Sequence, residues 1–195
     1  MSIQKTAEIL KANIEASQAL IGQLDRFAQP LADAATLIYE AIKAGGKLIS
    51  CGNGGSAADS AHFSAEIAGR YVMERRGFPA IDLSSNASLV TALANDYPPQ
   101  EVYARQVVAL GAAGDVLAVF TTSGNSENIT LALGAAKEAG IKTIAFLGRD
   151  GGQCKGRGDV EFIVPSDVTA RIQEAHELLY HSLCQVLDPL LVELG

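Results

Sequence analysis

His62 and Glu66, two side chains that can bind a metal ion or transfer a proton, stand four residues apart in a stretch of helical composition. On an α-helix this spacing puts both side chains on one face, about one turn apart, which suits two ligands of one ion. By itself such a pair is more typical of an ordinary surface ion pair. The glycine turn just before it, residues 52–56, favours a functional interpretation, because such turns bind anions.

That turn, Gly52-Asn53-Gly54-Gly55-Ser56, joins a predicted buried strand over 47–51 to a predicted helix over 57–70. Joints of this kind direct free backbone N–H groups and the positive end of a helix toward a ligand. The sequence therefore predicts a phosphate-binding turn beside the histidine and the carboxylate.

A second loop, residues 121–128, follows the predicted strand over 116–121 and opens another helix. It carries four hydroxyl side chains within six residues: Thr121, Thr122, Ser123 and Ser126. Asn125 or Ser126 could simply cap the helix, but this density of hydroxyls without lysine or arginine favours a phosphate cradle. No Gly-Lys-Ser/Thr follows, which argues against a nucleoside triphosphate site of the P-loop kind.

A dinucleotide site is the main alternative for the first loop. The run from Gly52 to Ala57 fits the loose pattern G-x-G-x-x-A, and Asp82 ends the next strand where a ribose-binding acid would stand. The pattern is weak alone. A nicotinamide enzyme would need neither the His/Glu pair nor the second loop, and 195 residues leave little room for a substrate domain.

The elements that must position these residues alternate between strand and helix. Two helices are predicted at the start, over 3–28 and 31–44 and separated by Pro30. Apolar strands then follow over 47–51, 80–83, 116–121, 143–147 and 160–164, interleaved with helices over 57–70, 87–94, 100–110, 126–139 and 170–191. This pattern predicts a three-layer α/β/α fold with a parallel sheet of about five strands, whose ligands lie at the carboxyl ends of the strands.

Composition limits the possible classes of protein. With 48 % hydrophobic residues, the chain 1–195 is expected to be one domain, a helical segment 1–44 followed by an α/β core 45–195. A net charge of -7 without a basic run argues against nucleic acid as a partner. No apolar stretch approaches ~20 residues and no signal core is visible, so we expect no membrane partner and a cytoplasmic protein. Three scattered cysteines, Cys51, Cys154 and Cys184, argue against a disulfide framework.

Taken together, the two loops resemble the SIS (sugar isomerase) domain family. The match is closest to the phosphoheptose isomerases and runs nearly end to end, the first forty residues excepted. It rests on Cys51 to Asp59, His62 to Glu66, Ala94-Asn95-Asp96, Thr121 to Ser126, Gly148 to Gly152 and Arg171 to His181. The resemblance implies a zinc-assisted aldose–ketose isomerase that converts sedoheptulose 7-phosphate to D-glycero-D-manno-heptose 7-phosphate through an enediolate. It also implies a role in lipopolysaccharide or surface heptose synthesis, and a homotetramer with sites between subunits.

The family's functional residues carry over by position, and every residue type is compatible. Thr121 departs from the serine that the family often has, but it keeps the hydroxyl. The resemblance makes Glu66 the catalytic base and His181 the catalytic acid, with one zinc ion per subunit bound by His62, Glu66, Gln173 and His181. The substrate contacts fall on Asn53, Gly54, Gly55, Ser56, Glu66, Asn95, Asp96, Thr121, Thr122, Ser123, Ser126 and Gln173.

Spacing in the final helix constrains these roles. His176 and His181 are ~140° apart around an ideal helix, so they should not bind the same ion and one is expected to be structural. Gln173 and His181 are separated by a rise of about 12 Å. Both can reach one zinc only if the side chains lean together, if a neighbouring subunit supplies one of them, or if part of the set binds at a time.

Two alternatives of other classes stay open. One is a non-enzymatic SIS adaptor that binds the replication initiator protein, a relative that lacks the carboxylate and the histidine which this chain keeps at Glu66 and His181. The other is a phosphosugar-sensing module, which would bind the ligand without isomerising it.

Overall fold

The computed structural model describes residues 3–195 and contains one parallel five-stranded sheet. Its strands are ordered β2-β1-β3-β4-β5. The bounds are Leu48–Gly52 (β1), Ala80–Asp82 (β2), Val116–Thr121 (β3), Lys142–Gly148 (β4) and Val160–Val164 (β5). The predicted α/β class with its parallel sheet is confirmed, and each strand begins and ends within two residues of its predicted position.

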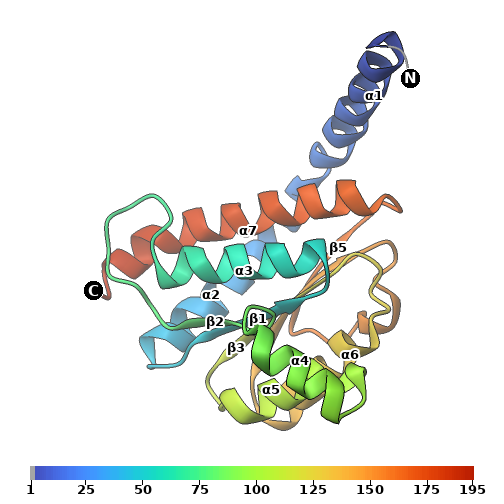
Figure 1. The fold of residues 1–195 in the computed structure, drawn as a ribbon. Coiled ribbons are helices and arrows are strands. Elements are labelled where there is room, and N and C mark those ends of the chain that lie inside the picture. Colours follow the sequence, from blue (N-terminus) through green and yellow to red (C-terminus); the bar gives the residue numbers. More distant parts are fainter. Residues whose placement is uncertain (1–2) are drawn as a thin grey trace.

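Helices cover both faces of the sheet (Figure 1). On one face, strand residues such as Val116 and Phe120 form a core with α2, α3 and α7; on the other, residues such as Leu117 and Val119 pack with α5 and α6. The alternation follows from the strand period of two, and burial on both faces explains why a central strand such as β3 is apolar at successive positions. The helices are α1 (Ile3–Ile21), α2 (Ala28–Lys43), α3 (Gly55–Ala68), α4 (Ala87–Asp96), α5 (Val102–Leu110), α6 (Glu127–Glu138) and α7 (Thr169–Val192), with short 3-10 turns at Leu24–Phe27 (η1), Pro99–Glu101 (η2) and Gly152–Cys154 (η3).

The strand order reverses at β1. The chain moves outward from β1 to β2 and then returns to the other side of β1 to form β3. In the register of these two strands Gly52 pairs with Phe120, so the loops that follow β1 and β3 start level with each other. Ligands of open parallel sheets bind at such a point. The two loops singled out in the sequence therefore lie where the topology favours a site.

The N-terminal segment differs in detail from the prediction. Pro30 does not separate two helices; it lies in the first turn of α2, which begins at Ala28. The first helical turn tolerates proline because its N–H groups have no partner within the helix. The preceding η1 turn makes the actual break.

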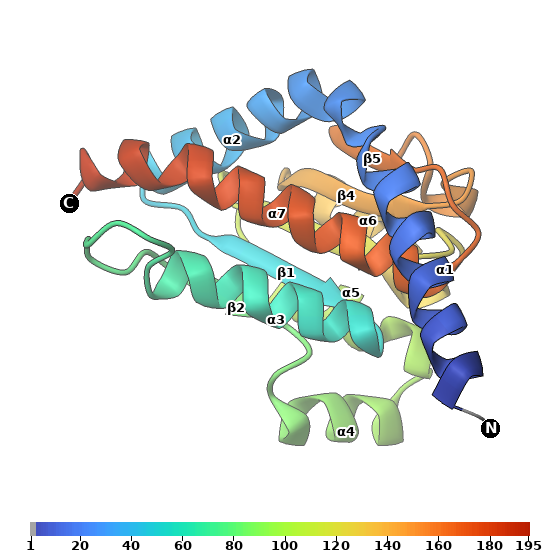
Figure 2. The same cartoon turned by 90° about the horizontal axis from the view of Figure 1, so that it is seen from above.

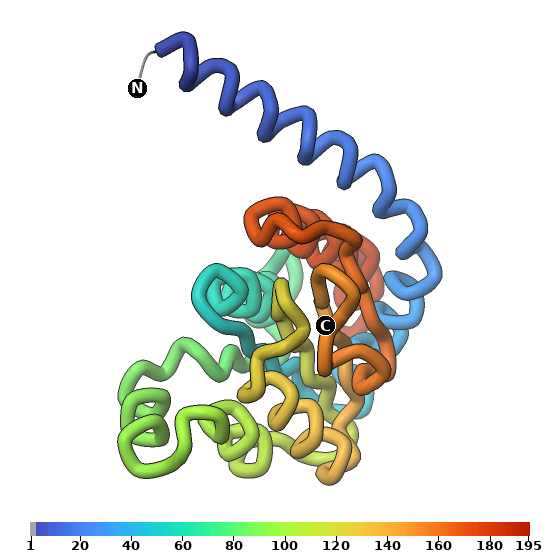
Figure 3. Tube along the Cα trace, turned by 90° about the vertical axis from the view of Figure 1, so that its right-hand side faces the viewer, coloured from blue at the N-terminus to red at the C-terminus, as the bar shows by residue number. Residues whose placement is uncertain are grey.

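Helix α1 extends away from the rest of the molecule (Figure 3). It is held at its base, where Ser17 Oγ donates to Glu174 at 2.7 Å and Arg171 donates to the carbonyl of Asn13 at 3.0 Å. Several of its apolar side chains are exposed, Ile3 by 91 % and Leu10 by 61 %. Across residues 3–195, no helix combines the length and the apolar character that a bilayer crossing requires.

Candidate active site

A small cavity of about 210 Å³ lies at the carboxyl edge of the sheet, between the loops that follow β1 and β3 and the first turns of α3 and α7. It brings together most of the side chains that the sequence assigned to a phosphosugar. Phe120 and Thr169 also line it and were missed. The complete lining is Asn53, Gly55, Ser56, Phe120, Thr121, Thr122, Ser123, Ser126, Thr169 and Gln173.

The glycine turn forms the cavity's wall on the β1 side, and its shape requires glycine. Gly54 has a φ of +58°, in the region that side chains rarely adopt. At Gly55 a Cβ atom would stand 2.2 Å from Nε2 of Gln173. The turn therefore approaches α7 closely and places the Gln173 amide against the cavity.

In the hydroxyl loop, residues 121–128, some hydroxyl side chains bond the backbone of the turn, while others are free to bind a ligand. Thr121 Oγ1 accepts the Gly124 N–H at 3.2 Å, and Ser123 Oγ accepts the Asn125 N–H at 3.1 Å. Ser126 is the N-cap of α6, but its side chain accepts no N–H of that helix, so the idea that its side chain caps the helix is wrong. An uncapped N-terminus with a nearby hydroxyl is suited to an anion.

Asn53 is committed to a contact between the two loops. Its amide pairs with that of Asn128 through two hydrogen bonds, of 2.9 Å and 2.8 Å. The sequence assigned Asn53 to the substrate and gave no sign of Asn128, which stands 75 residues away. The pair links the loops that follow β1 and β3.

Asp82 does not have the environment of a ribose-binding acid. Its carboxylate accepts hydrogen bonds from the hydroxyls of Ser60, Ser84 and Ser85. These donors hold the β2 end against α3 and occupy the carboxylate oxygens. The local structure thus argues against the dinucleotide alternative.

His62, Glu66 and His181 form a second cluster. One potential ligand atom from each lies within 4.8 Å of the other two. His62 Nε2 is 2.9 Å from Glu66 Oε1, and His62 Nδ1 is 2.9 Å from the hydroxyl of Tyr180. Two imidazoles and a carboxylate are a donor set that zinc accepts, and the hydroxyl beyond His62 is the kind of outer partner that orients a ligand. The residues therefore fit a zinc ion.

Aromatic rings hold His181 in place. Tyr71 stacks on it with ring centroids 5.8 Å apart and an angle of 28°, while Tyr180 approaches edge-on at 4.7 Å. The His62 ring lies 4.9 Å from that of His181. His181 is thus restricted to an orientation that faces the cluster.

His176 has a different environment, as its angular position predicted. It is fully buried, packs against Phe120 and Phe146, and places Nε2 3.1 Å from the carbonyl of Leu147. Burial lowers the pKa of His176 to about 4, although the contact with that carbonyl opposes the shift. His176 is therefore a neutral core residue, remote from the acid–base chemistry.

Asp59 is a further titratable group beside the cluster that sequence reasoning missed. It precedes His62 by three residues on α3, and within residues 3–195 its Oδ2 atom has no hydrogen-bond partner. Burial, reinforced by the nearby Glu177 carboxylate, raises the pKa of Asp59 to about 6, against the opposing effect of His62. A half-buried carboxyl group that titrates near neutrality can exchange protons with its surroundings.

The cavity and the cluster lie along the same two helices, α3 and α7, which run side by side (Figures 1 and 2). Ser56 and Gln173 line the cavity at the start of these helices. His62 follows Ser56 by a rise of about 9 Å, and His181 follows Gln173 by about 12 Å. The cavity and the cluster therefore follow one another along the two helices.

Other predicted residues do not meet at either place. Gly54, Asn95 and Asp96 are outside the cavity's lining. Asn95 donates to Asp96 at 2.8 Å on the exposed helix α4. Gln173 lines the cavity at the carboxyl edge, and the metal role assigned to it stays a prediction.

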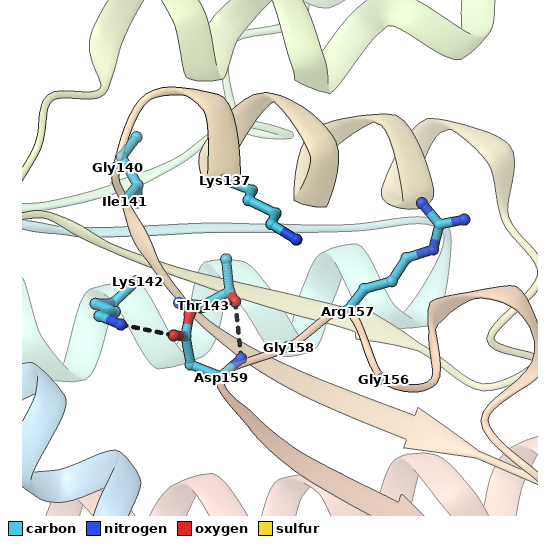
Figure 4. A pocket seen from close by; sticks show the side chains of 9 residues that line it. All are labelled: Lys137, Gly140, Ile141, Lys142, Thr143, Gly156, Arg157, Gly158 and Asp159. Carbon is cyan, nitrogen blue, oxygen red and sulfur yellow. Dashed lines mark hydrogen bonds and ion pairs between the residues drawn. The ribbon is translucent and has the colours of Figure 1, made fainter.

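Another hollow, of about 380 Å³, lies at the opposite edge of the sheet, where β4 and β5 begin (Figure 4). It contains exposed cations, but Lys142 is paired with Asp159 at 2.8 Å. The hydroxyl loop and the smaller cavity lie at the other, carboxyl edge of the sheet.

Comparison with known proteins agrees with this geometry. The family profile described as "SIS domain" matches residues 12–148, so the chain belongs to the SIS domain family. The chain is 50 % identical over 168 residues to the phosphoheptose isomerase of Alkalilimnicola ehrlichii, covering 85 % of this chain and 86 % of that protein. It is 47 % identical over 180 residues to the enzyme of the same name from Helicobacter pylori strain P12, covering 92 % and 94 %.

Solved structures give the same result. The phosphoheptose isomerase of Neisseria gonorrhoeae superimposes with a TM-score of 0.88 at 40 % identity, covering 94 % of this chain and 99 % of that one. That of Francisella tularensis gives 0.87 at 36 % identity, covering 97 % and 99 %. Within the SIS family the chain thus belongs to the phosphoheptose isomerases, a family of aldose–ketose isomerases, as the sequence motifs predicted.

Proposed function

We propose that this isomerase converts sedoheptulose 7-phosphate to D-glycero-D-manno-heptose 7-phosphate. The observation that carries the proposal is the placement of a polar cavity and a His/Glu/His cluster along the same two helices, α3 and α7. A phosphate at one end and a carbonyl at the other would be held by different parts of the same two helices.

His62, Glu66 and His181 would bind one zinc ion, and Gln173 is the fourth ligand that the resemblance implies. Zinc, when bound, supplies a Lewis acid that polarises the C2 carbonyl and acidifies the C1 protons. Glutamine is a weak ligand, so the position it occupies would exchange readily, as a catalytic site requires.

The chain's own residues would then move the protons. Thr122, Ser123 and Ser126 bind the 7-phosphate, and this remote contact aligns C1 and C2 with the cluster. Glu66 accepts a proton from C1, the proton of the C1 hydroxyl passes to the C2 oxygen, and His181 supplies the proton that adds to C2, which leaves the aldehyde at C1. Glu66 has to serve as base while it also neighbours the metal, which lowers its basicity.

The assembly implied by the resemblance is a homotetramer with sites between subunits. Two observations support it: α1 projects with exposed apolar side chains, and Asn95 and Asp96 lie outside the cavity of their own chain. A neighbouring subunit can bring such residues to the site. We assign the reaction to the cytoplasm, where buried free thiols such as Cys51 and Cys184 stay reduced, and the pathway to lipopolysaccharide or surface heptose synthesis.

The test is to incubate the purified protein with sedoheptulose 7-phosphate, with and without added zinc, and to detect the aldose product. Turnover that depends on zinc and is lost in Glu66→Gln supports the proposal. Phosphosugar binding without product would overturn it in favour of the sensing module. Absence of both binding and turnover would favour the adaptor.

A further inference from the structure

A buried ion pair holds the loop whose Tyr71 stacks on His181 of the His62/Glu66/His181 cluster. Residues 69–79 connect α3 to β2, and Arg75 of this loop pairs with Asp188 of α7 at 2.9 Å. Only 2 % and 3 % of their side chains are exposed. The desolvation cost of a buried ion pair is offset only when further hydrogen bonds satisfy both partners. The other hydrogen bonds of Asp188 and Arg75 therefore show which parts of the chain the pair holds.

Asp188 fixes the tip of the loop. Its Oδ2 atom accepts the backbone N–H groups of Val72 at 2.9 Å and Met73 at 2.6 Å. The side chains of both residues are largely exposed, by 68 % and 42 %. The tip is therefore held by its backbone and this one carboxylate rather than by side-chain packing.

Arg75 fixes the end of α3. Its guanidinium donates to the carbonyls of Glu66 at 2.8 Å, Ile67 at 3.2 Å and Gly69 at 3.1 Å. Glu66 and Ile67 belong to the last turn of α3 and Gly69 is its C-cap, where carbonyls have no N–H partners within the helix. The last turn of α3, which carries Glu66, is thereby tied to α7.

Both sets of contacts bear on the position of His181. Tyr71 immediately precedes the two residues held by Asp188, and its ring is the one that stacks on His181. We propose that Arg75 and Asp188 are positioning residues for the acid–base cluster: they hold Tyr71 over His181 and fix the backbone at Glu66. The effect of this positioning on catalysis rests on the proposed function, but the positioning itself can be tested without turnover.

The chain offers a matched control elsewhere in the fold, beside the starts of β1 and β3. Asp115 is 4 % exposed, accepts the backbone N–H groups of Lys47 at 2.9 Å and Ala112 at 2.8 Å, and pairs with the Lys47 amine at 2.6 Å. It has the same number and kind of donors as Asp188, yet it contacts no residue of the cluster. Asp115→Asn therefore removes the same kind of buried carboxylate as Asp188→Asn, but it should not change the position of Tyr71 or of the backbone at Glu66.

The experiment is NMR of full-length protein carrying isotope-labelled histidine, with all variants in the same metal state. The chain has three histidines, so the ring resonance of His181 can be assigned by substitution. In the parent, a nuclear Overhauser contact between Tyr71 and His181 is expected, and its absence would overturn the proposal without any variant. Tyr71→Leu gives the resonance of His181 without the stacked ring.

The His181 resonance should move toward its position in Tyr71→Leu in two variants: Asp188→Asn, and the double variant Arg75→Met with Asp188→Leu. Asp115→Asn should leave the resonance unchanged. The double variant removes both charges together, which buried pairs tolerate better than the loss of one. A folded double variant whose His181 resonance stays at the parent position would overturn the proposal, as would an equal shift in Asp115→Asn.

Kinetics provide the second measurement. Asp188→Asn should lower kcat about tenfold or more and leave KM within about twofold, because the phosphate cavity is untouched. A change in KM alone would contradict a role at the cluster. If the parent shows no turnover of sedoheptulose 7-phosphate, the proposed function fails, while the NMR result still decides whether the ion pair positions Tyr71.

Discussion

The hydroxyl of Tyr180 lies 2.9 Å from Nδ1 of His62 and thereby turns the other ring nitrogen, Nε2, toward Glu66. Burial, with the nearby carboxylates of Glu177 and Asp59, raises the pKa of Tyr180 above its ordinary range, so the hydroxyl keeps its proton at any working pH. A neutral hydroxyl can accept or donate, and so it can support His62 in either tautomer. Tyr180 is therefore the residue that orients the imidazole for a metal ion.

Tyr180→Phe should accordingly weaken zinc binding by roughly 10- to 100-fold, the usual effect of losing an outer partner of a ligand. The measurement is a competition titration with a chromophoric chelator. Tyr103→Phe is the control, because it removes another buried hydroxyl, one that donates to the Gly52 carbonyl away from the cluster. Equal zinc affinity in the parent and Tyr180→Phe would show that His62 is not a ligand through Nε2.

Glu66→Gln should keep the fold and phosphate binding but lose turnover by ~10²-fold or more, because the change is nearly isosteric and removes the base. Glu177→Gln is the matched control: this carboxylate is 4.0 Å from His62 but belongs to α7 and faces solvent more. Its activity should stay within a few-fold of the parent. Near-parental rates in Glu66→Gln would assign the base elsewhere, with Asp59 as the first candidate.

Ser123→Ala should weaken binding of substrate and of inorganic phosphate together, by about 1 kcal/mol for one lost hydrogen bond. Zinc content should not change, since the loop is remote from the cluster. Ser182→Ala, which removes an exposed hydroxyl bonded to the Leu178 carbonyl, should have no effect on either. Calorimetric titration with phosphate is the measurement, and undiminished affinity would place the anion on the glycine turn alone.

The sequence predicted the fold well because its signals are local. Strand β3 is an apolar run up to its final threonine, β5 is apolar except for Glu161, and the predicted bounds of both match those observed. The errors are at helix boundaries: the first helix ends at Ile21 rather than at residue 28, and α3 begins at Gly55 because Gly54 serves as its N-cap. Pro30 was interpreted as a boundary although a first turn accepts it.

The site was predicted only as far as local spacing reaches. His62 and Glu66 share a helix face, and the hydroxyl loop is contiguous, so both could be recognised. Tyr180 and Asn128 could not, because their partners stand 118 and 75 residues away and meet them only through packing of the folded chain. The side chain of Ser126 was assigned as a possible cap from its residue type, whereas the structure leaves it free of the helix.

The last prediction concerns pH and the buried histidine. The pKa of His176 falls from the 6.5 of an exposed histidine to about 4 in the folded protein. Between these values the unfolded chain binds a proton that the folded chain does not, so the stability of the parent decreases as the pH falls from about 6.5 to about 4. The full effect is roughly 3 kcal/mol. Burial of the neutral ring is what causes this linkage.

His176→Gln should remove this part of the pH dependence, because glutamine does not titrate and its amide can still donate to the Leu147 carbonyl. Urea denaturation at pH 7, 5.5 and 4.5 measures the free energy of unfolding of both proteins. His181→Ala is the control and should keep the slope of the parent, since His176 stays buried in it. Zinc content in His176→Gln should be near normal, whereas His181→Ala should lose both zinc and activity. A slope in His176→Gln equal to that of the parent would assign the acid sensitivity to other groups, and a zinc loss confined to His176→Gln would overturn the assignment of His181 to the cluster.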